Sequence, residues 1–375
     1  MSLYPDILSP TVVALPRSDF LTMLRLVRLL DWISRLPAYR DLVGPLAPEV
    51  ARFDPGHDAV MMCYDFHLSA QGPKLIEVNT NAGGGLPAYL VDRQLARLVP
   101  GDLPAGQRKR ILSQFCDEYR RFTHGRKKSP EHVVILDERP EQQFLYQEML
   151  FFAGLFRNAG MAAEVADPSE LDAEAAGVYL NDVPVDLVYN RHCDFYLESP
   201  EMSGLKEAYL ARTVCLTPNP FSYALLADKR RLTLWSDPGF VEQVALPERH
   251  ALLLRQTVPQ SRMLGDLDLD RAWQERRQSV FKPVTRFGSR GVLLGEKISR
   301  KRFNQLEPDQ TLVQELVPPS LTEGSPAGPM KTDFRVYAYR NRILGITARL
   351  YRGQVTNLRT EGGGFAKVFI AAEGS

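Results

Sequence analysis

Apolar and polar positions alternate with a period of two in a short stretch near the start of the chain, from Met61 to Asn81. Two β-prone runs, MMCYDFHL and KLIEVNTN, flank the loop SAQGP, and this pattern is typical of a β-hairpin. If the loop is symmetric about Gln71, Asp65 and Glu77 lie directly opposite each other, with Cβ atoms about 4.5–5.5 Å apart. Asn79 lies two residues beyond Glu77 and therefore projects from the same face of its strand.

The predicted hairpin brings two carboxylates and an amide together. Two facing carboxylates repel each other unless a cation lies between them or one of them is protonated. Three oxygen donors without His or Cys suit Mg²⁺ better than a transition metal, so Asp65, Glu77 and Asn79 are candidate magnesium ligands. The alternative is a set of solvated polar groups on an exposed sheet face. The run Gly83–Gly85 follows directly, and its backbone amides can meet an anion.

Periodic patterns divide the chain into three stretches. Residues 1–125 hold the hairpin and helical patterns, the strongest of them at 19–36. Residues 126–218 alternate between buried strands and helices, which predicts a small parallel α/β unit. Residues 219–375 begin with a helix capped by Asn219 and continue as antiparallel hairpins. The expected fold class is therefore α/β, with α+β character at the two ends.

A strand–loop–strand pattern covers Ser279–Gly295 in the third stretch. Lys282 is the single charge of an apolar strand, and the loop that follows contains Gly288, Ser289 and Gly291. A loop of this composition can fold over phosphates, and the alternative is an ordinary polar hairpin loop. No GxxxxGK[ST] occurs in the chain, so this is not a P-loop.

Further polar groups gather toward the end of the chain. An apolar strand pattern contains the run Gln314, Glu315, Leu316 and Val317. The alternation in TDFRVYAY places Asp333 and Arg335 on one face of the next strand. Three more groups precede a second triple glycine: Arg349, Asn357 and Arg359. Amides and guanidinium groups in this number suit a site for ATP and a carboxylate.

Taken in order, these motifs resemble the ATP-grasp superfamily of carboxylate–amine ligases, in particular its glutathione synthetase branch. The matching elements between Val280 and Gly364 are Phe281-Lys282-Pro283 with its glycine loop, Gln314–Val317, Asp333-x-Arg335, Ala348-Arg349 and Asn357-x-Arg359. The Asp and Glu-x-Asn strands that follow these motifs in the family lie at the front of this chain, as Asp65 and Glu77-x-Asn79. The resemblance therefore implies a circularly permuted ATP-grasp fold. It implies that residues 1–125 form the permuted C-terminal part, 126–218 a Rossmann-like substrate domain and 219–375 the nucleotide-binding part.

The resemblance also implies ATP and Mg²⁺ as cofactors, and roles for individual residues. Lys282 would pair with phosphates beneath the lid loop of Gly288, Ser289 and Gly291, while Gln314–Val317 would line the adenine pocket. Arg262 is the nearest counterpart of a first nucleotide-binding lysine. The residues expected to orient a carboxylate and steady an acyl phosphate are Arg335, Arg349, Asn357 and Arg359. The implied reaction joins a carboxylate to an amine and releases ADP and phosphate.

Two other functions stay open: an ATP-grasp kinase that phosphorylates a small molecule without ligation, and a non-catalytic nucleotide-binding protein. The substrates are expected to be small, with an amino acid or a peptide among the candidates. Arg191 follows a predicted strand, where it either binds a second carboxylate or is a surface group.

Composition removes several classes of partner. With 46 basic and 45 acidic residues the net charge is +1, so no general attraction to nucleic acid or anionic membrane is expected. The start of the chain lacks the pattern of a signal peptide, and no run approaches 18 apolar residues. Four cysteines without CxxC spacing predict thiols in a reducing cytoplasm. Assembly as a homodimer stays open.

Overall fold

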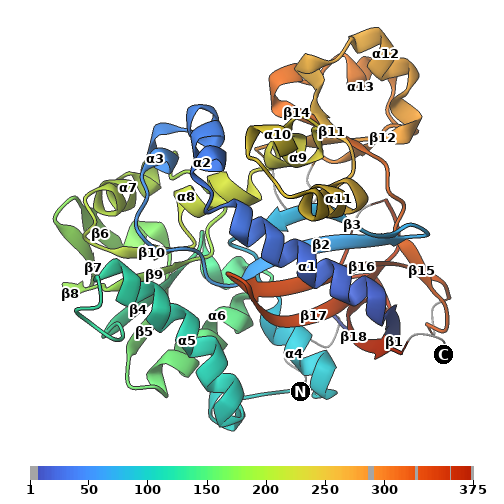
Figure 1. Cartoon of the computed structure of the whole chain (residues 1–375). Helices are drawn as coiled ribbons and strands as arrows, with labels where there is room; N and C mark the ends of the chain where they lie inside the picture. The colour runs from blue at the N-terminus through green and yellow to red at the C-terminus, as the bar shows by residue number, and fades with distance from the viewer. Residues whose placement is uncertain (1–6, 286–290, 326–327, 355, 373–375) are drawn as a thin grey trace.

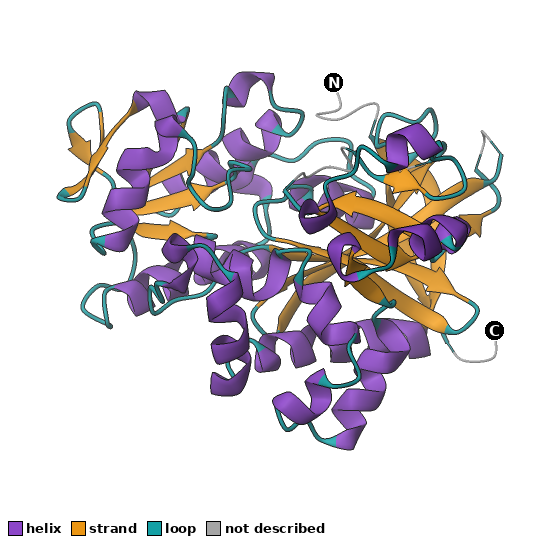
Figure 2. Ribbon diagram, turned by 90° about the horizontal axis from the view of Figure 1, so that it is seen from above, coloured by secondary structure: helices purple, strands orange, loops and turns teal. Residues whose placement is uncertain are grey.

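The computed structural model describes residues 7–285, 291–325, 328–354 and 356–372. Strands gather in a large mixed sheet, a small parallel sheet with a three-stranded hairpin sheet beside it, and a small antiparallel sheet (Figure 1, Figure 2). Helices pack around each of these sheets (Figure 2). Within the residues just given, no helix is long and apolar enough to cross a membrane.

The large sheet joins the two ends of the chain. Its strand order is β1-β18-β17-β16-β2-β3, with β15 also paired to β16. The N-terminal hairpin β2–β3 thus lies beside strands from the C-terminal part, blue beside red in Figure 1. The strands are β1 (Leu8–Pro16), β2 (Met62–Ser69), β3 (Gly72–Asn79), β15 (Ser320–Thr322), β16 (Met330–Tyr339), β17 (Arg342–Tyr351) and β18 (Gly364–Ala371).

Alternation along the central strands separates an apolar face from a polar one. Even-numbered residues of β2 and β16, such as Tyr64 and Val336, belong to a core cluster with helix α1 (Arg17–Ile33), which crosses this face. Odd-numbered residues point the other way. Close to helix α4 (Gly85–Arg93) they are apolar, and farther along they are charged, as at Asp65 and Arg335.

The predicted pairing of Asp65 with Glu77 is confirmed, although the turn differs from the prediction. The strands extend to a Ser69–Gly72 pair, which leaves a two-residue turn in place of the predicted five-residue loop. A register irregularity after Asp65 restores the expected register, so Cys63 pairs with Asn79. A bulge of this kind shifts a strand by one position, and here it keeps Glu77 and Asn79 on the face of Asp65.

The small parallel sheet has the parallel strands predicted within 126–218, and helices from residues 1–125 also pack on it. Its order is β10-β9-β4-β5, with all neighbours parallel, and helices cover both faces. We call it, with its helices, the small lobe. Its strands are β4 (His132–Leu136), β5 (Ala162–Ala166), β9 (Leu187–Asn190) and β10 (Cys215–Thr217). The hairpin sheet is β6 (Leu171–Glu174), β7 (Gly177–Leu180) and β8 (Val183–Pro184). The helices of the small lobe are α3 (Glu49–Arg52), α5 (Ala105–Phe122), α6 (Tyr146–Arg157) and α7 (Ser203–Leu210). Helix α2 (Pro37–Val43) belongs to the core of the large sheet.

The antiparallel sheet has the order β11-β14-β12-β13 and a small core of its own. The helix predicted from Asn219 is broken at Asp228, which has an extended ψ of 122°. The Asp228 carboxylate accepts hydrogen bonds from the Arg230 backbone and the Tyr196 hydroxyl, and this local bonding competes with the helix. The elements are α8 (Pro220–Ser222), a π-turn (Tyr223–Ala227), α9 (Arg231–Ser236), α10 (Phe240–Gln243), α11 (Glu248–Thr257), β11 (Ser261–Met263), α12 (Leu269–Gln274), β12 (Ser279–Pro283), β13 (Leu293–Leu294), α13 (Arg300–Phe303) and β14 (Thr311–Glu315).

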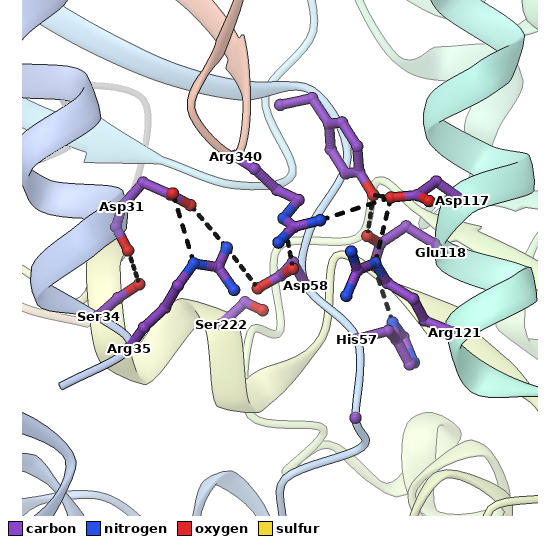
Figure 3. A network of polar contacts seen from close by, with 12 residues as sticks. Asp31, Ser34, Arg35, His57, Asp58, Asp117, Glu118, Arg121, Ser222 and Arg340 are labelled. Atoms are coloured by element: carbon purple, nitrogen blue, oxygen red, sulfur yellow. Dashed lines mark hydrogen bonds and ion pairs between the residues drawn. The ribbon is translucent and has the colours of Figure 1, made fainter. Parts of the chain in front are cut away.

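A buried polar network ties the small lobe to the large sheet (Figure 3). Glu118 of α5 lies 2.9 Å from the His57 ring, and the Tyr339 hydroxyl at the end of β16 lies 2.5 Å from the same carboxylate. Cys215 of β10 faces the other ring nitrogen at 3.9 Å. Burial would lower the pKa of His57, but the contacts with Cys215 and Glu118 raise it well above its ordinary value. A charged His57 therefore links helix α5, strand β10 and the end of strand β16.

Candidate functional site

Two cavities meet on the polar face of the large sheet. The strand cavity, about 390 Å³, lies between the antiparallel sheet and the large sheet. The lobe cavity, about 470 Å³, lies between the large sheet and the small lobe. The residues that line both are Glu77, Lys229, Arg349 and Thr356. A group bound in one cavity can therefore reach the other.

Lys282 of β12 projects into the strand cavity, where it is 5% exposed. Its ammonium group donates to Gln314 Oε1 at 2.6 Å and to the Ile76 carbonyl at 3.1 Å. Burial lowers the pKa of Lys282 to about 8, a shift that the nearby Glu77 carboxylate opposes. Among the described residues, no carboxylate forms an ion pair with this buried ammonium, which therefore suits an anionic ligand.

The expected adenine segment lines the same cavity. Gln314 and Glu315, the last two residues of β14, and Leu316 and Val317, which follow the strand, all belong to its wall. Part of their backbone is already bonded within the protein: the Leu316 amide donates to the Gln278 carbonyl at 2.8 Å, and the Val317 carbonyl lies 2.6 Å from His67 Nδ1. Apolar side chains such as Val280 and Leu321 also line this cavity, and we call this part of it the apolar slot; an apolar wall of this kind suits a planar ring.

Two guanidinium groups converge on Asp65 at the junction of the cavities. Arg335 makes a bidentate contact, with Nε 2.7 Å from Oδ1 and Nη2 2.6 Å from Oδ2, and Arg349 Nη2 lies 2.9 Å from Oδ2. Arg349 also donates to Asp333 at 2.6 Å. Burial alone would raise the pKa of Asp65, but the two guanidinium groups outweigh it and hold the pKa at about 2. Asp65 is thus a permanent anion that orients both arginines.

The three predicted magnesium ligands do come together. The Asn79 amide lies 3.3 Å from Asp65 Oδ2 and 3.4 Å from Glu77 Oε1. Glu77 and Asn79 are partly exposed to the lobe cavity, and their oxygen-bearing side chains fit a hard cation. Asp65 fits less well, because both of its oxygens already accept from guanidinium groups. Within the described residues, no cluster of three His, Cys, Asp or Glu side chains could hold a metal ion.

The predicted catalytic residues all line the lobe cavity: Arg335, Arg349, Asn357 and Arg359. Arg359 is exposed and lies over the Phe144 ring of the small lobe, with 4.9 Å from its guanidinium carbon to the ring centroid. Thr356, in the same loop, donates to Asp333 at 2.7 Å and so ties the loop to β16. The loop therefore reaches from the arginine cluster to the small lobe.

The glycine turn after Asn79 does bind an anion, but one supplied by the protein itself. The Glu148 carboxylate of α6 accepts from the Gly84 amide at 3.0 Å and from the Leu86 amide at 2.8 Å. Arg191 donates to the same carboxylate at 3.1 Å, and both side chains are buried. A Cβ at Gly83 would lie 2.1 Å from Arg191 and 2.4 Å from Glu148, so any larger residue there would displace the side-chain ends that form this ion pair.

Other predicted residues lie elsewhere. Arg262 on β11 is exposed and lines neither cavity, because the side chain of its neighbour Ser261 is the one that turns inward. Gly291 is partly exposed and also lines neither cavity. Gly288 and Ser289 lie outside the described residues.

Sequence reasoning missed two residues of the lobe cavity and its surroundings. Glu148 is a lone charge in the apolar helix pattern YQEMLFFAGLF, which is a usable signal for a buried ionic contact. Asp137 directly follows the buried strand β4, at the end of a parallel sheet where ligands usually bind.

Comparison with solved structures identifies the fold. A putative gamma-glutamylcysteine synthetase from Methylobacillus flagellatus KT superposes with a TM-score of 0.51 at 10% identity, over 98% of this chain and 90% of that one. The ATP-grasp ligase PsnB, complexed with its precursor peptide PsnA2 and AMPPNP, matches 59% of this chain and 76% of its own at 18% identity, with a TM-score of only 0.34. No protein-family model matches the sequence, and no curated protein matches it. The mixed α/β fold with several sheets, which the sequence predicted, is therefore shared with this putative gamma-glutamylcysteine synthetase over nearly the whole chain.

Proposed function

We propose that this chain is an ATP-dependent ligase that joins a carboxylate to an amine through an acyl phosphate, releasing ADP and phosphate. The observation that carries the proposal is the junction of two cavities at Glu77 and Arg349. One cavity offers an apolar slot and a buried ammonium, and the other offers arginine and amide groups. Such a pair of sites suits transfer of a phosphoryl group onto a second substrate, a reaction governed by positioning and charge.

The sheet topology supports the permuted order. In the large sheet β2 pairs directly with β16, so Asp65 lies beside Arg335 although 270 residues separate them. We propose that residues 1–125 supply the last strands of a grasp whose nucleotide-binding part is 219–375, and that 126–218 form the substrate domain.

The residue roles follow from the two cavities. Lys282 would meet the phosphates of the nucleotide, and the slot beside Glu315–Val317 would receive the adenine. Arg349, held by Asp65 and Asp333, would face the group in transfer, with Arg335 beside it. Preoriented donors of this kind stabilise charge that develops in a transition state without reorganising at the moment of reaction. Asn357 and Arg359 would hold the carboxylate substrate from the other side.

Glu77 and Asn79 would hold Mg²⁺, with the carboxylate of Asp65 behind them. The ion, when bound, would neutralise the charge of the phosphates. Glu77 lines both cavities, which is the place where such neutralisation is needed.

Thermal unfolding with and without Mg²⁺-ATP tests the nucleotide site without knowledge of the other substrates. Ligand at 100 times its dissociation constant stabilises a protein by about 2.7 kcal/mol, which should raise Tm by a few degrees. The shift should require Mg²⁺ and be lost in Glu77→Gln. The absence of any shift at saturating ATP would remove the proposal.

A screen of carboxylates and amines for ADP release then tests the reaction. ADP formation that requires both substrates would support a ligase. ADP formation with a single acceptor and no amine would indicate a kinase instead. A thermal shift without turnover on any substrate would favour the non-catalytic nucleotide-binding protein.

A further inference from the structure

One carboxylate of the lobe cavity has no part in the proposed reaction. Asp137 follows β4 at the carboxyl end of the small parallel sheet and lines the cavity, yet is only 8% exposed. Its Oδ1 accepts from the Glu138 amide at 2.9 Å, and Oδ2 has no donor among the described residues. Oδ2 is not among the fully buried atoms that lack a partner, so it keeps access to the cavity, where a ligand can donate a hydrogen bond to it.

The nearest cation is already committed elsewhere. Arg191, at the end of the neighbouring strand β9, donates to Glu148 at 3.1 Å and to the Asn81 carbonyl at 3.3 Å. Asp137 makes no ion pair with it or with any other described residue. Counted at this end alone, Asp137 and Glu148 against Arg191 leave one negative charge in excess, whereas the rest of the cavity wall carries the cations Lys229, Arg335, Arg349 and Arg359.

Asp137 keeps that charge at neutral pH. Burial raises its pKa to about 6, and Arg191 opposes the shift. Above this value the carboxylate is mostly ionised and attracts a cation into the cavity. The plain alternative is that Asp137 serves only to balance Arg191 at a distance.

Resting on the proposed ligase function, we propose that Asp137 recognises the amine substrate by binding it as an ammonium ion. The ammonium would donate to the open Oδ2, on the small-lobe wall opposite the arginine cluster. After it loses one proton to solvent, the neutral amine would attack the acyl carbon and release phosphate. The apolar side chains of Phe144, Leu145 and Met149 line the same cavity and would contact a carbon chain attached to the amine. Amines that are neutral at the working pH would gain nothing from this contact.

Two variants separate this role from a structural one. Asp137→Asn keeps the acceptor for the Glu138 amide and the size of the side chain but removes the charge. Glu138→Gln removes the same charge one residue away, on an exposed side chain that does not line the cavity. It is the matched control.

The binding test uses thermal unfolding of the full chain with Mg²⁺-ATP present, titrated with propylammonium chloride and, as its neutral analogue, 1-propanol. Propylammonium should stabilise the wild type and Glu138→Gln, and the alcohol should not. In Asp137→Asn the half-saturating concentration of propylammonium should rise about 10- to 100-fold, the value of a charge-assisted hydrogen bond. Equal affinity in the wild type and Asp137→Asn would overturn the proposal.

A turnover test uses the carboxylate found in the ADP-release screen. Hydroxylamine is neutral at pH 8 and captures acyl phosphates, so Asp137→Asn should retain ADP release with hydroxylamine while the KM for propylamine rises. Loss of both activities together would contradict a recognition role. Should Mg²⁺-ATP give no shift even in the wild type, the proposed function fails first; a normal ATP shift with no propylammonium effect removes only the role of Asp137.

Discussion

Replacing Asp65 by Asn should strongly destabilise the protein before any ligand is added. The change keeps the shape of the side chain but removes the charge that holds Arg335 in a bidentate contact and Arg349 at 2.9 Å. Arg349 would keep Asp333, but Arg335 would lose its only described carboxylate partner while remaining 9% exposed. An uncompensated buried charge is among the costliest defects in a protein.

The magnitude follows from two routes. A folded-state pKa of about 2 against the ordinary 3.8 corresponds to about 2.5 kcal/mol of stability. Removal of one member of a buried ion pair costs about 3–5 kcal/mol. Because the pKa of Asp65 is lowered on folding, this stability is present above the ordinary pKa and is lost as pH falls from about 4 toward 2. The expected loss for Asp65→Asn at pH 7 is therefore about 3 kcal/mol.

Urea denaturation without nucleotide measures this loss, with Glu77→Gln as the matched control. Glu77 is partly exposed and makes no ion pair among the described residues, so Glu77→Gln should stay within about 0.5 kcal/mol of the wild type. If Asp65→Asn were as stable as Glu77→Gln, the ion pairs of Asp65 with Arg335 and Arg349 would not contribute to stability, and the reasoning would be refuted. In that case its role would return to that of a metal ligand alone.

Three further outcomes follow from the site. Lys282→Met should raise the dissociation constant for Mg²⁺-ATP at least tenfold, as measured by calorimetry at pH 7. The affinity of the wild type should fall above pH 8, because the Lys282 ammonium loses its proton there. An affinity that does not change with pH would contradict the contact between Lys282 and the phosphates. Glu148→Gln should cost about 3–5 kcal/mol, since Arg191 is left without its buried partner, and the double variant with Arg191→Met should recover much of the loss in urea melts. His57→Gln should lower the free energy of unfolding most below pH 6.5, because the raised pKa of His57 contributes fully to stability there. The difference in stability from the wild type should shrink as pH rises through the folded-state pKa. A difference that stays constant with pH would mean that the pair with Glu118 is not ionic.

The hairpin and the central strands were predictable because their period of two is a strong local signal. Asp65 and Glu77 were placed opposite each other, and Asp333 and Arg335 on one face, from alternation alone. The actual turn is shorter than the predicted one, and the irregularity after Asp65 compensates for the difference. Core alternation on the other face fixes this register, since a one-residue slip would turn the charged side chains into the apolar core and Tyr64 toward the cavities.

The dependence on alternation also explains why Arg262 was expected at the nucleotide site, although it lies on the exposed face of β11. Arg262 lies on a strand of three residues, too short for alternation to show which face is buried. In the fold, Ser261 faces Gln314 across the pair and Arg262 points to solvent. Contacts between the large sheet and the small lobe could not be predicted from the sequence for a different reason. Nothing local to the glycine turn indicates that Glu148, some 60 residues later, supplies the anion for its amides.

The internal anion at the glycine turn changes what the turn can do. Because Glu148 already accepts from the Gly84 and Leu86 amides, these donors are not open to a phosphate. The turn instead anchors the end of β3 to the small lobe, and Glu77 and Asn79 lie on that strand end. The position of the proposed metal ligands relative to the lobe cavity is thus fixed by a contact between domains. Any motion that opened the small lobe would pull on β3, so the two cavities should respond together when either of them is filled.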